Sequence, residues 1–387
     1  MTEITGVRTT KNIAGARVQV DMAKDIALLD PNEGPFVTFL KAAKKDSRVV
    51  YNPKFEWLED DLLATWSQAN GGISAAATTL AVDDGALFRV GDIVKIPETA
   101  ENMLVTAVAG NNLTVSRGYG STVAAAVSDQ AHVLNIGPAM MENSSLRTVK
   151  STLETNGYNY TQIFRTPIAL SGTEAASHLH GGKDRAYQRR KASIEHKRDI
   201  ARAMYFGQRK EDTTGAAPRR AMGGLIEMIG AANSVAFDAG SLPITYRNFD
   251  NQVAKAAFRY GSQEKLLIAG PNLASAINTW AEKKLVTEVD ANSTFGMRVK
   301  NLVTTYGDLK VIYDPLLEGA VYGSYGFIVD TENVRYAYLE GRDTKLNINV
   351  QPNDVDGLVD EYLTECSLEL RLPQTHLIIT GAYVPAE

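Results

Sequence analysis

The chain has almost no cysteine and no long apolar run. Cys366 is the only cysteine among 387 residues, so an intrachain disulfide and a cysteine-based zinc or iron–sulfur site are excluded. No apolar stretch approaches the ~20 residues that cross a bilayer, and the opening MTEITGVRTTKNIAG lacks the apolar core of a signal peptide. We therefore expect a soluble protein that folds in a reducing cytoplasm and has no membrane partner.

A surplus of positive charge is also missing. The formal net charge is -5 and the pI is about 5.7, whereas a protein that grips phosphates as its main role usually carries a basic excess. Apolar residues make up 44% of the chain and charged residues 22%, which are ordinary values for a folded soluble protein. The composition argues against disorder and against tight DNA binding as the main role.

The short motifs of the commonest enzyme classes do not occur. The chain has no Walker A loop, no GxGxxG after a strand, no GxSxG elbow and no HExxH. These absences count modestly against nucleotide-binding proteins, α/β-hydrolases and zinc proteases.

Two weaker metal patterns fail on geometry. His178 and His180 lie two apart on an expected helix, so they point to different faces. Aligning the run NDVDG (353–357) with a calcium loop places Pro352 and Leu363 at the first and last ligand positions, where neither side chain offers an oxygen. We interpret the run as a tight turn and predict no catalytic, cofactor-binding or metal-ligating residue.

Adjacent carboxylates at Glu59 and Asp60 are the remaining candidate for an active site. A glycan-acting enzyme needs two carboxylates that face one substrate, and side chains next to each other in the chain rarely converge in this way. An enzyme with an unrecognised site is kept as a minor alternative.

The N-terminal part of the chain divides into an arm and a strand-rich unit. The first 34 residues have few large apolar side chains, so we expect an arm that orders against another surface, with a frayed terminus as the equal alternative. A short helix is expected at 36–45 and an extended segment at 49–63. Short strand patterns fill 71–135, with a hairpin turn at 109–112. They predict a small β-barrel or sandwich.

A long helix is expected next. Ser171 and Glu174 match a capping box, in which a serine hydroxyl and a glutamate satisfy the first helix amides. The helix could run over 173–207 and would be roughly 50 Å long at ~1.5 Å per residue. Gly181 and Gly182 could kink or break it near its start. Its apolar residues are sparse, which is typical of a helix that supports other elements.

Basic side chains gather on this helix. One interpretation is a surface that faces DNA. The other, which we favour, is a solvated face with local ion pairs to Asp184, Glu195 and Asp199. Tyr187 is the one tyrosine among these charges, fewer aromatic side chains than a base-stacking platform carries. The seven residues are Arg185, Arg189, Arg190, Lys191, Lys197, Arg198 and Arg202.

A loop that leads to a short apolar segment is expected at 215–229, and helical and strand patterns alternate after it. They predict a compact α/β or α+β domain around a central sheet, and the alternation over 358–384 predicts long closing strands. Helices are expected at 249–260 and 272–284, and strands at 266–270, 309–315, 327–330, 334–339 and 346–350.

This order of elements resembles the major capsid protein fold of tailed bacteriophages, the Hong Kong ninety-seven fold. It is most similar to the branch that carries a small β-domain inside the extended loop (E-loop). The specificity lies in the order and spacing of five stretches, which are FEWLEDDL (55–62), LFRVGDIVKIPETAENMLVTAVAGNNLTVSRGYGST (87–122), NYTQIFRTPIALSGTEAASHLHGGKD (159–184), AMGGLIEMI (221–229) and DEYLTECSLELRLPQTHLIITG (360–381).

The resemblance implies an α+β fold of the tailed-phage capsid type with an inserted small β-barrel-like domain. It also implies boundaries along the chain. These are an N-terminal arm with a short helix at 1–47, an E-loop at 48–70 and 136–170, an inserted β-domain at 71–135, a peripheral (P) domain at 171–245 and 331–387 with a spine helix at about 173–207, and an axial (A) domain at 246–330.

The function implied is that of a major capsid protein, which self-assembles into the pentamers and hexamers of an icosahedral shell around double-stranded DNA. The implied partners are further copies of the chain, a separate scaffolding protein, a portal, a decoration protein, and packaged DNA through weak non-specific contact. The protein would reside in the virion after assembly in the bacterial cytoplasm. Other virion proteins, for decoration or a tail tube, remain alternatives.

Some members of this family crosslink their subunits through an E-loop lysine. Lys54 lies in the corresponding region, but nothing in its sequence surroundings marks it as reactive. The crosslink is therefore not carried over to this chain.

Overall fold

The computed structural model forms two compact units. One spans Leu58–Asn156 and is called here the barrel unit; the rest of the chain is called the body. The paired strands β2 (Lys54–Glu59) and β9 (Thr155–Tyr160) lie where the chain passes from one unit to the other. The structure describes residues 35–42, 47–177, 184–238, 240, 242–284, 300–319 and 321–382.

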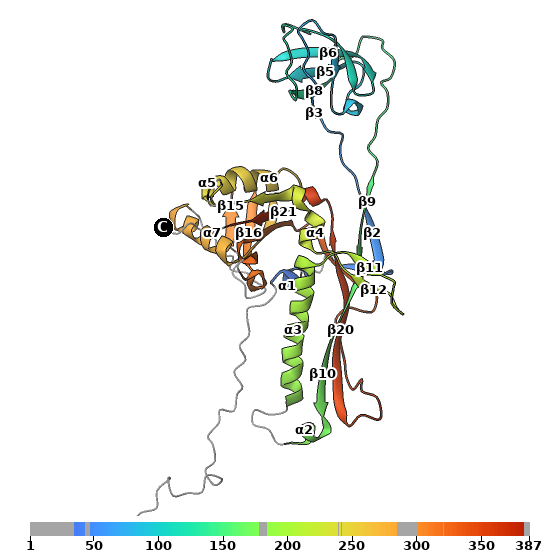
Figure 1. Ribbon diagram of the computed structural model, residues 1–387, viewed down its shortest axis with the longest axis vertical. Helices are drawn as coiled ribbons and strands as arrows, with labels where there is room; N and C mark the ends of the chain where they lie inside the picture. Colours follow the sequence, from blue (N-terminus) through green and yellow to red (C-terminus); the bar gives the residue numbers. More distant parts are fainter. Residues whose placement is uncertain are drawn as a thin grey trace, which may run out of the picture. The chain divides into compact units, whose positions relative to one another are not determined.

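A long antiparallel strand pair organises the first sheet of the body (Figure 1). β20 (Gly357–Leu370) pairs with β10 (Gln162–Ser171) over ten residue pairs. The opposite edge of β20 pairs with β19 (Lys345–Asn347) and β18 (Val334–Leu339), and β18 pairs in parallel with β1 (Arg48–Val50). The predicted long closing strand is therefore confirmed as the centre of this sheet.

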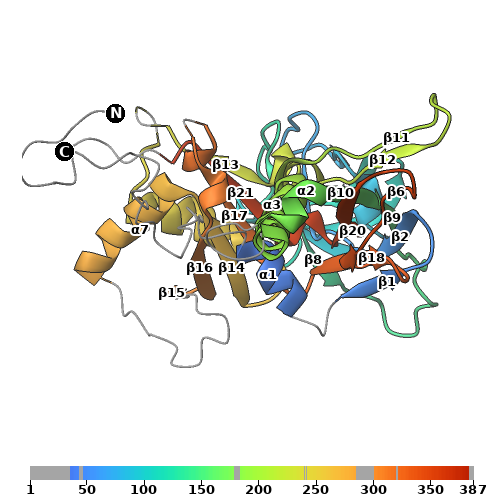
Figure 2. The same cartoon turned by 90° about the horizontal axis from the view of Figure 1, so that it is seen from below.

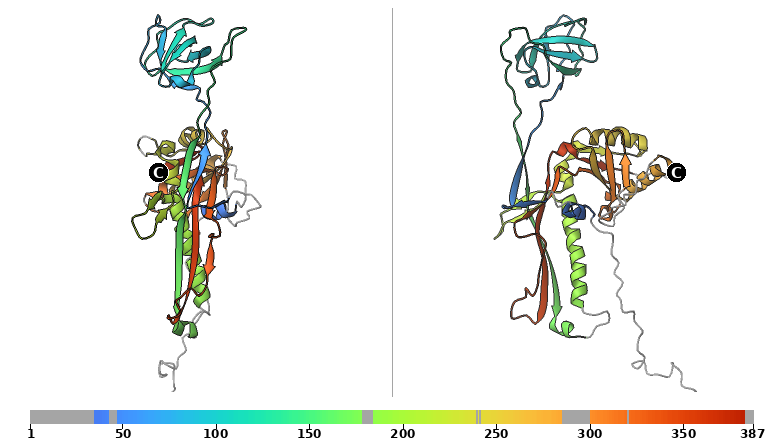
Figure 3. Two further views of the ribbon diagram at one scale, coloured as in Figure 1. Left: turned by 90° about the vertical axis from the view of Figure 1, so that its right-hand side faces the viewer. Right: turned by 180° about the vertical axis from the view of Figure 1, so that it is seen from behind.

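Helix α3 (Asp184–Phe206) lies along β10 and β20, as Figures 1 and 3 show. Its C-terminal half buries Ile200, Met204 and Tyr205 in the body's core together with α1 (Pro35–Ala42). The N-terminal half is almost without apolar side chains, so it cannot be held by hydrophobic packing alone. It is held by ion pairs, described below.

The prediction of one continuous helix over 173–207 is wrong. The predicted cap is confirmed, because the Ser171 side chain accepts a 3.2 Å hydrogen bond from the Glu174 amide. The helix that it starts, α2 (Gly172–Ala176), stops at once, since Ser177 is extended with ψ 146°. Outside the described residues lie His178, His180, Gly181 and Gly182.

The second sheet of the body is mixed. β14 (Glu264–Ala269) lies at its centre and pairs in parallel with β16 (Asp308–Tyr313) and antiparallel to β17 (Gly326–Asp330). Figures 1 and 2 show helices packed beside this sheet. They include a continuous helical stretch with a π-helical middle. The helical segments are α5 (Tyr246–Asn248), η6 (Phe249–Ala254), α6 (Lys255–Ala257) and α7 (Pro271–Lys284).

Two strands at one end of this sheet lie outside the range predicted for the A domain. β21 (Leu377–Thr380) pairs with β17, and β13 (Ser234–Ala236) pairs with β21. Both strands fall in the predicted P ranges, 171–245 and 331–387, yet they complete the six-stranded sheet that the predicted A range begins. β15 (Lys300–Val303) forms the other edge.

None of the described helices is long and apolar enough to cross a bilayer.

Short elements connect the larger ones. The remaining elements of the body are the hairpin β11 (Lys210–Asp212) and β12 (Arg219–Ala221), helix α4 (Leu225–Ile229), and the 3-10 turns η5 (Ala231–Asn233), η7 (Pro315–Leu317), η8 (Tyr322–Ser324) and η9 (Pro373–Thr375).

The barrel unit is a six-stranded sheet that closes on itself. The two end strands, β3 and β4, meet where Ala69 bridges Val82, and the Asp83 amide donates to the Gln68 carbonyl at 2.9 Å. The expected β-unit at 71–135 is therefore too short, because β3 precedes it. In spatial order the strands are β3 (Trp66–Gln68), β8 (His132–Pro138), β5 (Asp92–Ile96), β6 (Glu101–Ala109), β7 (Asn112–Ser116) and β4 (Thr79–Ala81).

The hairpin predicted at 109–112 is confirmed. Ala109 pairs with Asn112, and Gly110 takes the positive φ of 60° that this tight turn needs. The turn packs on the 3-10 turn η4 (Gly85–Leu87), where a Cβ on Gly85 would lie 2.0 Å from the Gly110 carbonyl oxygen. Only glycine fits this contact.

Candidate functional site

The basic face of α3 is partly consumed inside the body. Both Arg185 and Arg189 donate to the carboxylate of Asp360 on β20, through Nε at 2.8 Å in each case. Asp360 is only 1% exposed, and the two guanidiniums hold the pKa of its carboxyl well below its usual range. These arginines therefore fasten α3 to the sheet and do not form an open cationic surface.

Two other cations of the cluster make the local pairs that the sequence predicts. Lys191 lies 3.9 Å from Glu195, and Arg202 lies 3.2 Å from Asp199. Asp184 accepts hydrogen bonds from the side-chain amide of Gln188. The DNA-facing interpretation of the whole cluster is therefore not supported at Arg185 and Arg189, whose partner comes from a distant strand.

A second row of ion pairs covers the opposite face of β20. Glu361, Glu365 and Glu369 are four residues apart, so they share one face of the strand, and each is less than 8% exposed. Their partners were not predicted, and all but Arg371, which is two residues from Glu369, come from other segments of the chain. Arg165 binds Glu361, Arg342 binds Glu365 at 2.5 Å, and Glu369 binds Arg48 at 2.8 Å and Arg371 at 2.5 Å.

Lys54 is engaged in contacts that keep it charged. Its ammonium lies 2.5 Å from Glu56 and 4.8 Å from the centre of the Tyr158 ring. The hydrogen bond with Glu56 raises the pKa of Lys54, which favours the protonated form that is not a nucleophile. Arg209 lies 4.7 Å from the same ring. The group anchors the base of the β2–β9 pair to the body.

The remaining candidate residues do not converge. Asp60 accepts a 2.7 Å hydrogen bond from the hydroxyl of Thr152. Glu59, the residue before it, is the last residue of β2. The 353–357 run is a turn, with the Val355 amide donating to the Pro352 carbonyl at 3.2 Å. Among the described residues, no group of three His, Cys, Asp or Glu side chains could hold a metal ion.

Comparison with known proteins identifies the family to which this combination of elements belongs. The SU10 major capsid protein family matches residues 3–383. The chain belongs to the SU10 major capsid protein family. A major capsid protein of Pseudomonas phage PaMx41 is 26% identical over 333 residues, which cover 80% of this chain and 79% of that protein.

Solved capsids share the fold with little sequence identity. The capsid of cyanophage A-1(L) has a TM-score of 0.50 at 10% identity, covering 97% of this chain and 99% of that chain. The capsid of an empty GTA particle has a TM-score of 0.50 at 9% identity, covering 97% and 98%. The expected phage capsid fold is confirmed, and this protein is a structural capsid protein. The sites that matter in it are therefore interfaces.

The segment that returns from the barrel unit is held in an ordered position. Arg147 pairs with the buried Asp92 of the barrel, and Lys150 donates to the Phe88 carbonyl at 2.6 Å. Burial lowers the pKa of Lys150. These contacts hold the side chains of Arg147 and Lys150 against the strands and turns of the barrel.

Large apolar side chains are exposed on this segment, residues 146–153, and on the segment that follows β2. Leu146 is 99% exposed, Val149 90% and Leu153 86%, and Leu62 on the outgoing segment is 96% exposed. Side chains this exposed leave apolar surface that a neighbouring protein could cover. We call these four residues the connector apolar set.

Proposed function

We propose that this protein is the major head protein of a tailed bacteriophage and forms the pentamers and hexamers of an icosahedral shell around double-stranded DNA. The observation that carries the proposal is the family match over residues 3–383, nearly the whole chain. Under this proposal the chain works through contacts with its own copies, which build the shell by geometry and need no active site.

Contacts within a ring of identical subunits are heterologous, so one patch meets a different patch on the next copy, and the ring closes at five or six. The connector apolar set supplies one such patch. Removing apolar surface from water stabilises a contact by ~25 cal/mol per Å². Because only a few side chains are covered at this contact, its binding free energy is modest. Many linked contacts make the shell stable, because each raises the effective concentration of the next.

The proposal extends to domain roles and partners. Residues 1–47 form the arm and its short helix, residues 48–70 and 136–170 act as the E-loop on either side of the inserted β-domain, and the two sheets of the body correspond to the P and A domains. A separate scaffolding protein and a portal guide assembly in the bacterial cytoplasm, and a decoration protein can bind the finished shell. Packaged DNA meets the inner wall through weak, non-specific contacts.

Negative-stain electron microscopy of the purified protein tests the proposal. Rings and closed shells are the expected result. Tubes would favour a tail-tube protein, and uniform small particles at every concentration would contradict self-assembly.

A matched pair of variants tests the connector apolar set. Leu62→Ser with Leu146→Ser and Leu153→Ser should leave folded subunits that no longer form shells. The control, Val90→Ser with Val123→Ser, removes side chains of the barrel's own surface that are 55% and 82% exposed; it should still give shells. Equal assembly by both variants would exclude the connectors as an interface.

A further inference from the structure

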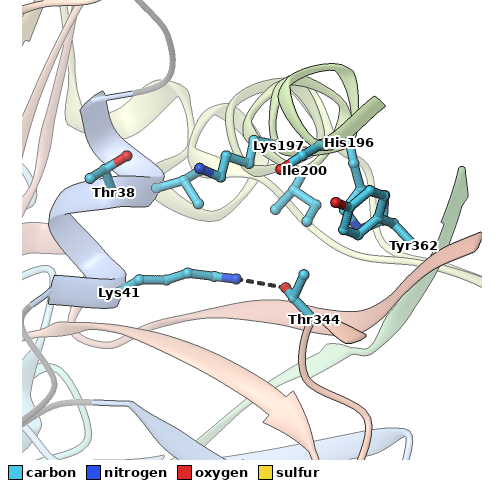
Figure 4. A pocket seen from close by; sticks show the side chains of 9 residues that line it. Thr38, Lys41, His196, Lys197, Ile200, Thr344 and Tyr362 are labelled. Atoms are coloured by element: carbon cyan, nitrogen blue, oxygen red, sulfur yellow. Dashed lines mark hydrogen bonds between the residues drawn. The ribbon is translucent and has the colours of Figure 1, made fainter. Parts of the chain in front are cut away.

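A cavity of about 350 Å³ opens in the body between α1 and α3 (Figure 4). Val37 and Ile200 contribute apolar side chains to its lining. Lys41 reaches in from α1 and Lys197 from α3, on facing sides. The described residues that line it are Val37, Thr38, Lys41, Ser193, His196, Lys197, Ile200, Thr344 and Tyr362.

The polar groups of this cavity are all cations, hydroxyls and one imidazole. Among the described residues, no aspartate or glutamate lines the cavity, although the chain as a whole carries a net charge of -5. Asp343 lies 3.7 Å from the Lys41 ammonium but does not line the cavity. The lining thus offers the ammonium of Lys197, the ammonium of Lys41 with Asp343 beside it, and several hydroxyl donors.

A chain of hydrogen bonds leads from the cavity to a buried histidine. The Lys41 ammonium donates to Thr344 at 2.9 Å, and Thr364 donates to Thr344 at 3.0 Å. Thr364 also contacts His196 Nε2 at 2.7 Å, and Thr166 contacts Nδ1 at 2.9 Å. The His196 ring therefore reports on the charge of the cavity.

The surroundings of His196 disfavour the protonated, positively charged form of its ring. Burial lowers the pKa of His196, the positive charge of Lys41 lowers it further, and Asp199 opposes both. An anion in the cavity would offset the field of Lys41 and raise this pKa.

We propose that this cavity binds a phosphate group. Lysine ammoniums and Ser, Thr and Tyr hydroxyls are the side-chain donors that hold phosphate oxygens in protein–nucleic acid contacts. Lys41, Lys197, Thr38 and Ser193 provide this set from two facing helices. Arg185 and Arg189, the first candidates from sequence, are already used by Asp360.

The source of the phosphate rests on the proposed function. In a DNA-filled shell it is the sugar–phosphate backbone, and the contact carries no base readout because only phosphate oxygens are recognised. Free inorganic phosphate has the same chemistry and is distinguished by experiment.

Fluorescence anisotropy with a short labelled duplex, at about 0.02 M salt and upward, gives the first test. The log of affinity should fall with the log of salt concentration, at ~0.9 per phosphate neutralised. Lys41→Met with Lys197→Met should weaken binding about tenfold or more and lower the slope by one to two. Lys191→Met with Arg202→Met removes the same charge from α3 outside the cavity and should have a much smaller effect. Equal losses in both variants would overturn the proposal.

Lys197→Met alone keeps the test valid if Lys41→Met destabilises the fold, because Lys197 is an exposed side chain. Microscopy of each variant separates this proposal from the preceding one. Both double variants should still form shells, so a loss of binding with intact shells supports the site. If wild-type protein forms no shells, the proposed function is contradicted. The binding measurement does not depend on shell formation and still tests the phosphate site.

Nuclear magnetic resonance of His196 gives the second test. Titration with inorganic phosphate, at constant ionic strength against chloride, should raise the pKa of His196, and Lys41→Met with Lys197→Met should abolish that change. A duplex that raises the pKa at a lower concentration than phosphate identifies nucleic acid as the ligand. No change with either probe overturns the proposal. A change with an acidic peptide alone would also overturn it, in favour of a protein partner.

Discussion

The hydroxyl of Tyr205 donates a 2.6 Å hydrogen bond to the carboxylate of Asp314, and both side chains are fully buried. Tyr205 belongs to α3 and Asp314 follows β16, so the bond joins the long helix to the second sheet. Burial raises the pKa of Asp314, and the bond from Tyr205 opposes this effect.

Tyr205→Phe should therefore destabilise the body by roughly 1–3 kcal/mol, since it removes a partner of a buried carboxylate. The loss should be larger at pH 7 than at pH 4, because the ionised carboxylate needs the donor most. Urea unfolding at the two pH values measures it. The control is Tyr306→Phe, an exposed tyrosine, which should change stability little; equal effects at both pH values would contradict the assignment.

Asp360→Asn should loosen α3 from the first sheet. The wild-type pKa of Asp360 is lowered in the folded state, so its ionised form contributes stability above the unfolded pKa of ~3.9, and this is lost as pH falls through the folded pKa. We expect a cost of about 1–3 kcal/mol at pH 7, shrinking below about pH 4. Hydrogen exchange along α3 should rise at neutral pH. A variant with unchanged protection of α3 would show that the two arginines do not hold the helix.

His376 should make the body acid-sensitive. Its Nδ1 accepts from the Asp330 amide and its Nε2 donates to the Arg371 carbonyl, both at 3.1 Å, and burial lowers its pKa to about 4. A histidine with a lowered folded pKa binds fewer protons when folded, so stability falls as pH drops from ~6.5 towards about 4.

His376→Gln can keep both hydrogen bonds without titrating, so its stability should fall less over that pH range. Thermal unfolding between pH 7 and 4 measures the difference. His132→Gln, at an exposed site in the barrel unit, is the control and should leave the body's acid response as in wild type. A parallel decline in wild type and His376→Gln would rule out this histidine as the cause.

The barrel unit should fold without the body. It has its own buried core and a closed ring of strands, so residues 58–156 expressed alone should unfold cooperatively. The complementary deletion, closed with a short flexible linker, should leave the body's circular dichroism and protease resistance intact. Deleting only 71–135 should do worse, because it leaves β3 and part of β8 unpaired. A body that loses its structure without the barrel unit would contradict the independence of the two.

Removing residues 1–34 should separate folding from assembly. The segment has few large apolar side chains, so it contributes little to a core. We expect soluble subunits or capsomers with wild-type circular dichroism and no normal shells in the microscope. Efficient formation of normal shells by the truncated protein would contradict a role for the arm in assembly.

The sequence by itself determined the features that depend on neighbours in the chain. The cap at Ser171, the hairpin turn at Gly110 and the alternating strand β20 were all predicted, because caps, turns and two-residue periodicity act over a few residues. The order of these elements also carried the family resemblance, which needs no chemical motif.

Only the tertiary structure decided which distant residues meet. Asp360 lies 171 residues from Arg189 in the chain, β21 crosses into the second sheet, and the barrel closes where Ala69 meets Val82. The phosphate-binding cavity likewise joins Lys41 to Lys197 from two helices. Charge and periodicity along a chain do not specify such pairings, because each depends on how sheets and helices pack after the local elements have formed.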